Sequence, residues 1–449
     1  MIRRLQITDF FGVQGNTKQI VFENGLTIMV GKNGSGKTTI LNMLHALLTS
    51  SFNFLSRFSF GHMEVEADGG LLTVERLPEG LRVGRYDPHR AQKPLVDRVV
   101  SDENEWQLSG NECAALHLGI EALYFPTYRR LEMDFDRLFD DLLEPKPWGY
   151  PFFRSENEAL RRLRNLQTHS PWFLATNPAG LPRTVIGLSR KDIEQIVKGE
   201  SERVESFERE RLNKLIRDFV ASLIARPAPG LGFDQRGRDE LYHELYEPLS
   251  RTGLTECLGD DPNGAVLRYV EMVTESLERV SGGPASKKRA GSSSNDAVAA
   301  LMNIMSYAYV TRFLQMYREA RSQIEEHQAP LRGLLDLLSG FLDKPVILKD
   351  GRLVFSEDGK LGFEHLSAGE KQLVTLFAYT KLATKPGGLI LIDEPELSLH
   401  VEWQRALLSS LLSGSTGVQY LVATHSPMII AGHRDRVVSI GAHGDGEGA

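Results

Sequence analysis

A glycine-rich segment near the N-terminus has the residue types and the spacing that hold a phosphate group. Residues 31–39 read Gly-Lys-Asn-Gly-Ser-Gly-Lys-Thr-Thr and fit the pattern G-x-x-x-x-G-K-[ST]. In such a loop backbone N–H groups face the phosphate, Lys37 reaches the β and γ oxygens, and the Thr38 hydroxyl is a ligand for Mg²⁺. The segment therefore predicts a nucleotide site. Its expected nucleotide-binding residues are Gly31, Asn33, Gly34, Ser35, Gly36, Lys37, Thr38 and Thr39.

Three polar residues far along the chain could supply the remaining chemistry. Asp393 and Glu394 follow a run of four apolar residues, at the end of a predicted strand where ligands bind in α/β sheets. We expect Asp393 to hold Mg²⁺ and Glu394 to orient and deprotonate an attacking water. His425 follows the next apolar strand, which begins at Gln419, and can hydrogen-bond the γ-phosphate and that water.

A weaker signal lies between these groups. Ser367 and Gly369 stand at the start of a predicted helix whose apolar residues begin at Leu373. A hydroxyl, free N–H groups and the positive end of the helix dipole suit a γ-phosphate. Many serine-rich helix starts look similar, so this segment predicts a phosphate contact only together with the others.

The residues around these motifs predict an α/β arrangement. Apolar residues alternate over 26–30 as in a strand, and they recur at helical spacing over 40–48, so the phosphate lies at a helix N-terminus. Residues 63–76 predict an antiparallel hairpin, and 346–355 predict two further short strands. Residues 122–126 predict a buried strand. An antiparallel β lobe is therefore expected beside the nucleotide core.

The middle of the chain has a different pattern. Residues 78–110 are polar and rich in turn formers, which favours a solvated loop over a nucleic-acid patch. The region 135–342 is predicted to be helical, with a long helix over about 295–327. Its mostly charged stretch 198–211 is too short and irregular for a long heptad arm. The low-complexity stretch 281–295 predicts a disordered linker, or less favourably a contact with a polyanion.

Length and composition limit the class of protein. A chain of 449 residues is expected to form two or three units, and its net charge of −7 argues against a polyanion binder as a whole. The sequence contains no run of about eighteen apolar residues, so it predicts no membrane-spanning helix. The two cysteines, Cys113 and Cys257, are far apart, so we expect no disulfide framework and a reducing, cytoplasmic location.

The four motifs in this order resemble those of ABC-type ATPases. Residues 31–38 match Walker A, 366–372 the signature, 389–394 Walker B, and His425 the switch histidine. The resemblance implies an α/β fold, a P-loop ABC-type ATPase head with an antiparallel β lobe and a helical insertion. It also implies ATP and Mg²⁺ as ligands and a homodimer or higher oligomer, because two heads of that family enclose two nucleotides. Each site would pair the Walker A of one chain with Ser367 of another.

The long insertion favours one branch of that family. Lys37 and Ser367 are 330 positions apart (367 − 37), and the chain ends resemble RecF, OLD-type and SMC-type ATPases. The implied domains are 1–134 and 343–449 for the two halves of the head, and 135–342 for the insertion. Transporter ATPases carry an aspartate where this chain has residues 398–400, and no glutamine loop is identifiable. Weak candidates for that loop are Gln107 and residues 128–130.

The resemblance also bears on function. OLD nucleases continue into a nuclease domain, whereas this sequence has 24 residues after His425 (449 − 425), so we expect any nuclease to act in trans. ATPase subunits of the PARIS and Septu antiphage systems are similar in this respect. The leading hypothesis is therefore a defence ATPase that controls a separately encoded nuclease or toxin, triggered by DNA or a phage protein. A RecF-like DNA-repair ATPase is the alternative, and a transporter ATPase is disfavoured by the insertion.

Overall fold

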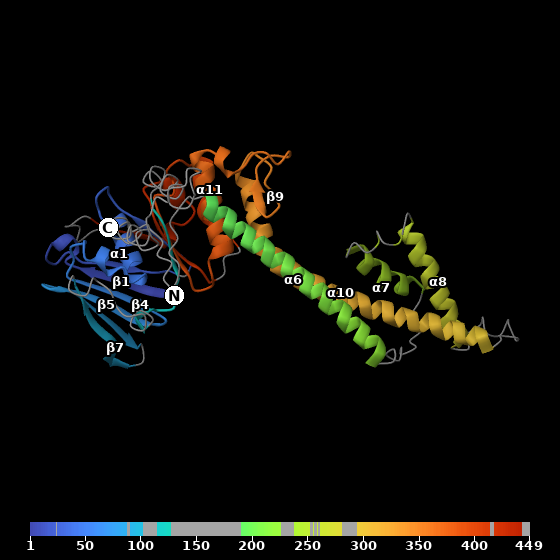
Figure 1. Ribbon diagram of the computed structural model, residues 1–449. Coiled ribbons are helices and arrows are strands. Elements are labelled where there is room, and N and C mark those ends of the chain that lie inside the picture. Colours follow the sequence, from blue (N-terminus) through green and yellow to red (C-terminus); the bar gives the residue numbers. More distant parts are fainter. Residues whose placement is uncertain are drawn as a thin grey trace, which may run out of the picture. The chain divides into compact units, whose positions relative to one another are not determined.

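The computed structural model describes residues 1–23, 25–87, 90–101, 115–126, 190–225, 238–251, 255, 258, 261–280, 294–413 and 417–441 (Figure 1). The chain divides into two compact units. Unit 1 comprises Met1–Glu200 and Leu331–Ala449, and unit 2 comprises Ser201–Pro330. Several predictions lie outside the described residues: most of the linker near 281–295, both cysteines, Gln107 and the segment 128–130.

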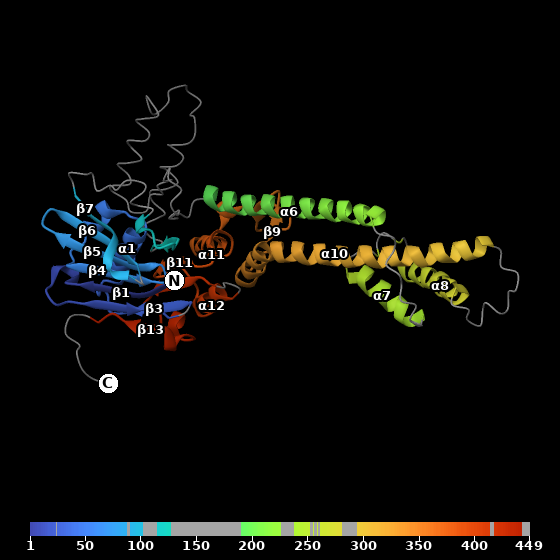
Figure 2. The same ribbon diagram turned by 90° about the horizontal axis from the view of Figure 1, so that it is seen from below.

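Five parallel strands form the central sheet of unit 1, in the order β13-β3-β12-β11-β8. Their bounds are β3 Leu26–Val30, β8 Ala122–Phe125, β11 Leu389–Asp393, β12 Gln419–Ala423 and β13 Val437–Ser439. Figure 2 labels β3, β11 and β13 of this sheet. The strands predicted before the glycine loop and before the two acids are confirmed. Strand β11 is apolar on both faces because Leu389 and Leu391 enter one core cluster, and Ile390 and Ile392 enter the other.

The helices of unit 1 cover both faces of this sheet. On one side lies α1, and on the other lie α11 and α12. The bounds are α1 Lys37–Leu48, α2 Phe52–Leu55, α11 Ala368–Ala378, α12 Val401–Leu412 and α13 Pro427–Ile430, with a π-helical turn η6 at Tyr379–Ala383. The described part of unit 1 also contains the 3₁₀ turns η1 Phe10–Gly12, η5 Phe363–His365 and η7 Arg434–Arg436. The predicted hairpin near 346–355 is β9 Ile347–Lys349 with β10 Arg352–Val354.

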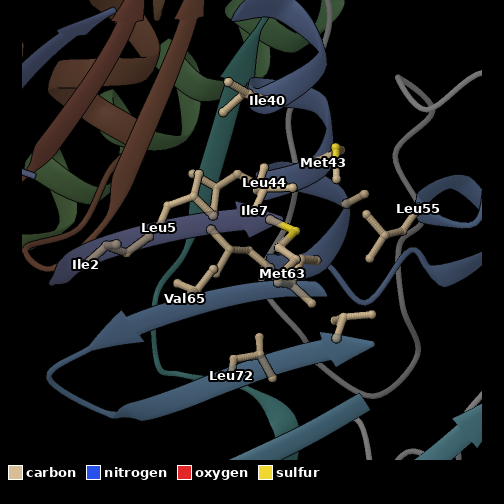
Figure 3. Close-up of a cluster of buried hydrophobic side chains, with 14 of the residues drawn as sticks. Ile2, Leu5, Ile7, Ile40, Met43, Leu44, Leu55, Met63, Val65 and Leu72 are labelled. Atoms are coloured by element: carbon tan, nitrogen blue, oxygen red, sulfur yellow. The ribbon is translucent and has the colours of Figure 1, made fainter. Parts of the chain in front are cut away.

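A second sheet forms the antiparallel lobe, in the order β2-β1-β4-β5-β6-β7. Its strands are β1 Ile2–Thr8, β2 Lys18–Val21, β4 His62–Ala67, β5 Gly70–Leu77, β6 Gly80–Asp87 and β7 Arg90–Val100. Ala67 pairs with Gly70, so the predicted hairpin is confirmed with Asp68 and Gly69 as its turn. Figure 3 shows side chains of β1, β4 and β5 packed against those of α1, such as Met43 and Leu44.

The prediction of a solvated loop over 78–110 is wrong for residues 80–87 and 90–100. These form β6 and β7, which pair with each other and extend the lobe. Leu81 and Val83 are fully buried, whereas Arg82, between them, is exposed on the other face. A half-exposed strand needs a buried apolar residue only at every second position. The many polar residues at the other positions concealed this alternation in the sequence.

A buried amide links the two sheets. The backbone N–H of Ile2 in β1 donates to Oε1 of Gln419 at 2.6 Å, and Nε2 of Gln419 in β12 donates to the carbonyl of Ile2 at 2.9 Å. Gln419 is 3% exposed. Because buried backbone groups need partners, this pair fixes the lobe to the nucleotide core.

Replacing Gln419 with Met should therefore destabilise unit 1. Two buried backbone groups lose their partner, so the free energy of unfolding should fall by about 2–4 kcal/mol. Urea unfolding measures the change, and Gln315→Met, at an exposed position of α10, is the matched control. Equal stabilities of the two variants would contradict a structural role for the amide.

Long helices dominate the inserted region. Helix α6 runs over Arg190–Ala225 and α10 over Ser294–Phe341, with α7 Arg238–Arg251 and α8 Pro262–Val280 packed on α10 in unit 2. The predicted helix 295–327 is too short at its C-terminal end, since α10 continues through Pro330. Leu334 and Leu338 recur at helical spacing and are fully buried in unit 1, which outweighs the hydrogen bond lost at the proline.

The charged stretch 198–211 lies within α6, one helix of 36 residues, and the expectation that it forms no long heptad arm stays a prediction. Within unit 2 the ring of Phe207 stacks on His327 of α10, with centroids 4.1 Å apart. Tertiary packing of this kind stabilises a helix whose own residues are mostly charged. Among the described residues, no helix combines the length and apolar character that a membrane crossing requires.

Candidate nucleotide site

The glycine loop occupies the turn between β3 and α1, as the strand–loop–helix order predicts. Gly36 has φ +96°, and a Cβ there would lie 2.4 Å from the ring of Phe10. A Cβ on Gly31 would lie 2.6 Å from the carbonyl oxygen of Ile440. Both positions therefore require glycine. Asn33 and Gly34 are exposed, Ser35 is buried, and Thr38 and Thr39 are half-buried in the first turn of α1.

Lys37 folds back into this turn. Its Nζ donates to the carbonyl of Gly31 at 3.0 Å and lies 2.6 Å from Nε2 of His425. Burial lowers the pKa of Lys37, although the charges of Glu394 and Asp393 oppose this shift. This separation is that of a hydrogen bond, in which the roles of the two nitrogens depend on the tautomer of the imidazole. The structure thus joins two predicted residues that are 388 positions apart.

Thr38 and Asp393 also meet. The Thr38 hydroxyl donates to Oδ2 of Asp393 at 2.9 Å, and Asp393 is 2% exposed. A hydroxyl beside a carboxylate offers the oxygen ligands that Mg²⁺ prefers, so these residues fit the ion. Among the described residues, no group of three or more His, Cys, Asp or Glu side chains is placed to hold a metal by itself, at this site or at another. Phosphate oxygens and water would therefore complete the coordination shell.

Glu394 follows Asp393 on the same edge of the sheet. Its Oε1 lies 3.9 Å from Nε2 of His425. Burial raises the pKa of Glu394, as do the charges of Asp393 and Glu396. Its φ of +47° is uncommon for a residue with a side chain. Strands β11 and β12 are parallel, with Asp393 opposite Ala423, and this register brings the two loops together.

Glu396 lies in the same cluster, although the sequence analysis assigned it no role. Its carboxylate accepts hydrogen bonds from the Thr424 hydroxyl and from the backbone N–H groups of His425 and Ser426. The available signal was a third acid directly after Asp393-Glu394-Pro395. The sequence could not reveal its partners, because they follow another strand.

Ser367 and Gly369 lie at the start of α11, as predicted. Ser367 caps α11 in a reciprocal box with Glu370, whose carboxylate also binds Lys344 at 2.7 Å. A Cβ on Gly369 would lie 2.2 Å from the carbonyl oxygen of Ser398, so the helix start packs against the loop after β11. Across the described part of the chain, no hydrogen bond joins Ser367 or Gly369 to residues 31–39.

The fold and the site define a class of protein. A parallel sheet carries the glycine loop at the end of β3, the acids at the end of β11 and a histidine after β12. The antiparallel lobe adjoins this sheet, and long helices are inserted between its strands. This is a P-loop ATPase fold of the ABC type, with an antiparallel β lobe and a helical insertion, as the sequence predicts.

Comparisons with known proteins find matches to separate parts of the chain. A family model described as "AAA domain, putative AbiEii toxin, Type IV TA system" matches residues 286–431, and one described as "AAA domain" matches residues 4–76. The "Retron Vc95 probable ATPase" of Vibrio cholerae serotype O1 biovar El Tor is 30% identical over 88 residues. That match spans 17% of this chain and only 17% of the relative's length.

Solved structures of Smc heads overlap with the chain only loosely. One is the Smc head domain with an extended coiled coil bound to the C-terminal domain of ScpA, from Pyrococcus furiosus, with 14% identity and a TM-score of 0.35. The match covers 98% of this chain and 92% of that one. The Smc head with a coiled coil and joint from Pyrococcus yayanosii gives 15% identity, 98% and 94% coverage, and a TM-score of 0.34.

The P-loop fold and the two AAA-domain matches together support an ATPase. The two AAA matches cover the glycine loop in the first half of the chain and the acids and His425 in the second. Nucleotide binding and ATPase activity are therefore supported at the level of the family. The closer likeness to PARIS or Septu ATPases stays a prediction.

Proposed function

We propose that this chain binds and hydrolyses ATP at a site completed by a second copy, and that it regulates a separate effector in antiphage defence. One observation carries the ATPase part of the proposal. Lys37, Thr38, Asp393, Glu394 and His425 gather where β3, β11 and β12 end, although up to 388 positions separate them. This edge of a parallel sheet is where α/β folds bind ligands.

Each residue of this cluster has a role in the proposal. The N–H groups of residues 31–36 and the Lys37 ammonium bind the phosphates, and Thr38 and Asp393 hold Mg²⁺. The ion, when bound, neutralises charge that develops on the phosphate oxygens. Glu394 orients the attacking water and accepts its proton, while His425 hydrogen-bonds the γ-phosphate.

The raised pKa of Glu394 suits this role. A carboxyl that burial and neighbouring acids make more basic accepts a proton more readily than an ordinary glutamate. The 3.9 Å approach to His425 places the acceptor beside the group that would contact the γ-phosphate. The proton acceptor Glu394 and the phosphate-binding His425 would thus be neighbours in the site.

The hydrogen bonding of Ser367 within its own helix start supports a shared site. Ser367 is exposed, and its backbone N–H and hydroxyl both bond Glu370 rather than residues of the glycine loop. A helix N-terminus is a good phosphate site, so this one is available to a nucleotide held by another copy. The proposed unit is therefore at least a dimer.

Replacing Ser367 with Arg should abolish hydrolysis by blocking this pairing. The exposed position accommodates the side chain, and the lost cap costs only about 1 kcal/mol, so the chain should fold. The decisive measurement mixes this variant with Lys37→Ala. Neither is active alone, but a mixed dimer has one intact site, which predicts recovery of roughly a quarter of wild-type ATPase activity.

Ser339→Arg, at an exposed position of α10, is the matched control and should hydrolyse ATP like the wild type. If the Ser367 variant is fully active by itself, the site is not shared. If the mixture stays inactive although both variants are folded, pairing of the glycine loop with Ser367 from another chain is excluded.

The defence role rests on weaker support. It draws on the toxin named in one matching family model, the retron named for the matching relative, and the likeness to PARIS and Septu ATPases. The test is capture of a tagged chain expressed with its neighbouring genes, with and without ATP. An ATP-dependent nuclease or toxin partner supports defence. Tight, steeply salt-dependent binding to duplex DNA without any partner favours DNA repair instead.

A further inference from the structure

We infer that Glu396 is a positioning residue that holds residues 424–426, and through them the ring of His425, in place for ATP hydrolysis. This inference rests on the proposed ATPase function. It assigns a role to an acid that contacts the protein rather than the nucleotide. Three observations carry it: the hydrogen bonds of the carboxylate, a second link between the same loops, and the short distance from Lys37 to His425.

The carboxylate of Glu396 binds three consecutive residues. Oε2 accepts from the Thr424 hydroxyl at 2.8 Å. Oε1 accepts from the backbone N–H of His425 at 2.7 Å and from that of Ser426 at 3.0 Å. Both oxygens are thus engaged by the segment that carries the histidine. Hydrogen bonds to a charged acceptor are about twice as strong as neutral ones.

A second link closes a ring around the same two loops. Nε2 of Gln404 in α12 donates to the carbonyl of Glu396 at 3.3 Å and to that of Leu399 at 3.0 Å. The Ser426 hydroxyl donates to Oε1 of Gln404 at 2.7 Å. The loop after β11 and the loop after β12 are therefore joined by the carboxylate on one side and by this amide on the other.

His425 and Ser426 need such a partner because they lie beyond the strand ladder, whose last hydrogen bond on this side runs from the Thr424 N–H to the carbonyl of Met29 in β3. β12 ends at Ala423, and Ser426 is already the N-cap of the four-residue helix α13. The N–H groups of His425 and Ser426 have no strand or helix partner, and Glu396 accepts both. Since the Lys37–His425 contact is 2.6 Å, a small shift of this backbone would separate Lys37, His425 and Glu394.

Two single substitutions separate positioning from charge. Glu396→Gln removes the charge but keeps the reach: its carbonyl can accept both N–H groups, and its amide can donate to the Thr424 hydroxyl. Glu396→Asp keeps the charge but is one methylene shorter, so it cannot span the three donors. Positioning predicts that the Gln variant hydrolyses ATP nearly as the wild type does, whereas the Asp variant loses about 10- to 100-fold in kcat with little change in KM.

The His425→Ala background shows whether the effect acts through the histidine. There, Glu396→Asp should cause no further loss of kcat, because the group that it positions is gone. An equal loss in both backgrounds would overturn the inference. So would a Gln variant that is inactive while the Asp variant is active, since that ranking would mean that the charge itself is required.

A spectroscopic readout is independent of activity. In chain labelled with ¹⁵N-histidine, the backbone amide of His425 should show the downfield proton shift of a hydrogen bond to a carboxylate. The shift should be largely kept in Glu396→Gln and lost in Glu396→Asp, without nucleotide present. If the wild type fails to hydrolyse ATP, the proposed function fails. The amide signal would still show whether the Glu396 carboxylate binds the backbone N–H of His425. An unchanged signal in the Asp variant would refute this contact.

Discussion

Replacing Glu394 with Gln should lower kcat for ATP hydrolysis by about 10²–10⁴-fold and leave ATP binding intact. Gln keeps the size and polarity of the side chain but cannot accept the proton of the attacking water. Lys37, Thr38 and Asp393 keep their contacts, so the affinity for ATP should not change. The bound nucleotide should then persist and hold two copies together, which size-exclusion chromatography with ATP and Mg²⁺ detects.

The pH dependence follows from the same group. Burial first, and then the charges of Asp393 and Glu396, raise the pKa of Glu394, while His425 and Lys37 act in the opposite direction. Only the carboxylate is a base, so the wild-type rate should rise with pH through this raised pKa and fall below it. The acid limb should therefore lie above the pKa of an ordinary glutamate. It should disappear in the Gln variant.

The unfolding temperature of Glu394→Gln shows whether a loss of activity could come from a loss of stability. A carboxyl whose pKa is raised in the folded state costs stability as pH rises through its unfolded pKa toward the folded one. A neutral Gln avoids that cost, so the variant should unfold at the same or a higher temperature than the wild type at pH 7. Glu402→Gln, at an exposed position of α12, is the matched control for activity. Normal turnover by Glu394→Gln would exclude this residue as the base.

Replacing Lys37 with Ala should weaken ATP binding by about 10- to 100-fold, in keeping with the roughly 1.5–3 kcal/mol of a hydrogen bond to a charged group. The ammonium is buried, and its partners are the carbonyls of Gly31 and Lys32 and the ring of His425. A phosphate oxygen would be a stronger partner for the ammonium than a carbonyl or an imidazole nitrogen. Hydrolysis should fall at least as much, because the same charge stabilises the transferring phosphoryl group.

Isothermal titration with ATP and Mg²⁺ measures this loss directly. Lys360→Ala, at an exposed position in the turn after β10, removes the same charge elsewhere in unit 1 and should bind ATP like the wild type. An unchanged affinity in Lys37→Ala would remove the glycine loop from the phosphate site. If both lysine variants lose affinity equally, the effect is one of overall charge.

Local sequence predicted the central sheet better than its surroundings. The strands before the glycine loop, before Asp393 and before His425 are short apolar runs with turn residues at their ends, and such runs signal buried strands without reference to the rest of the chain. The strands β6 and β7 were missed because their exposed faces carry arginines and other polar residues. The C-terminal end of α10 was predicted too early because a proline is a local signal for the end of a helix. The burial of Leu334 and Leu338, which extends the helix, depends on tertiary packing.

By itself, the sequence predicted the residues that we propose to carry the chemistry. Residues 31–39, Asp393-Glu394 and His425 are recognisable because each group lies within a few consecutive positions, next to the strand that presents it. Only the tertiary structure decided how these groups combine. The parallel register of β3, β12 and β11 brings Lys37 to His425 and Thr38 to Asp393, and it engages Glu396 with residues 424–426. Pairing between strands is set by packing across hundreds of residues, which no local pattern encodes.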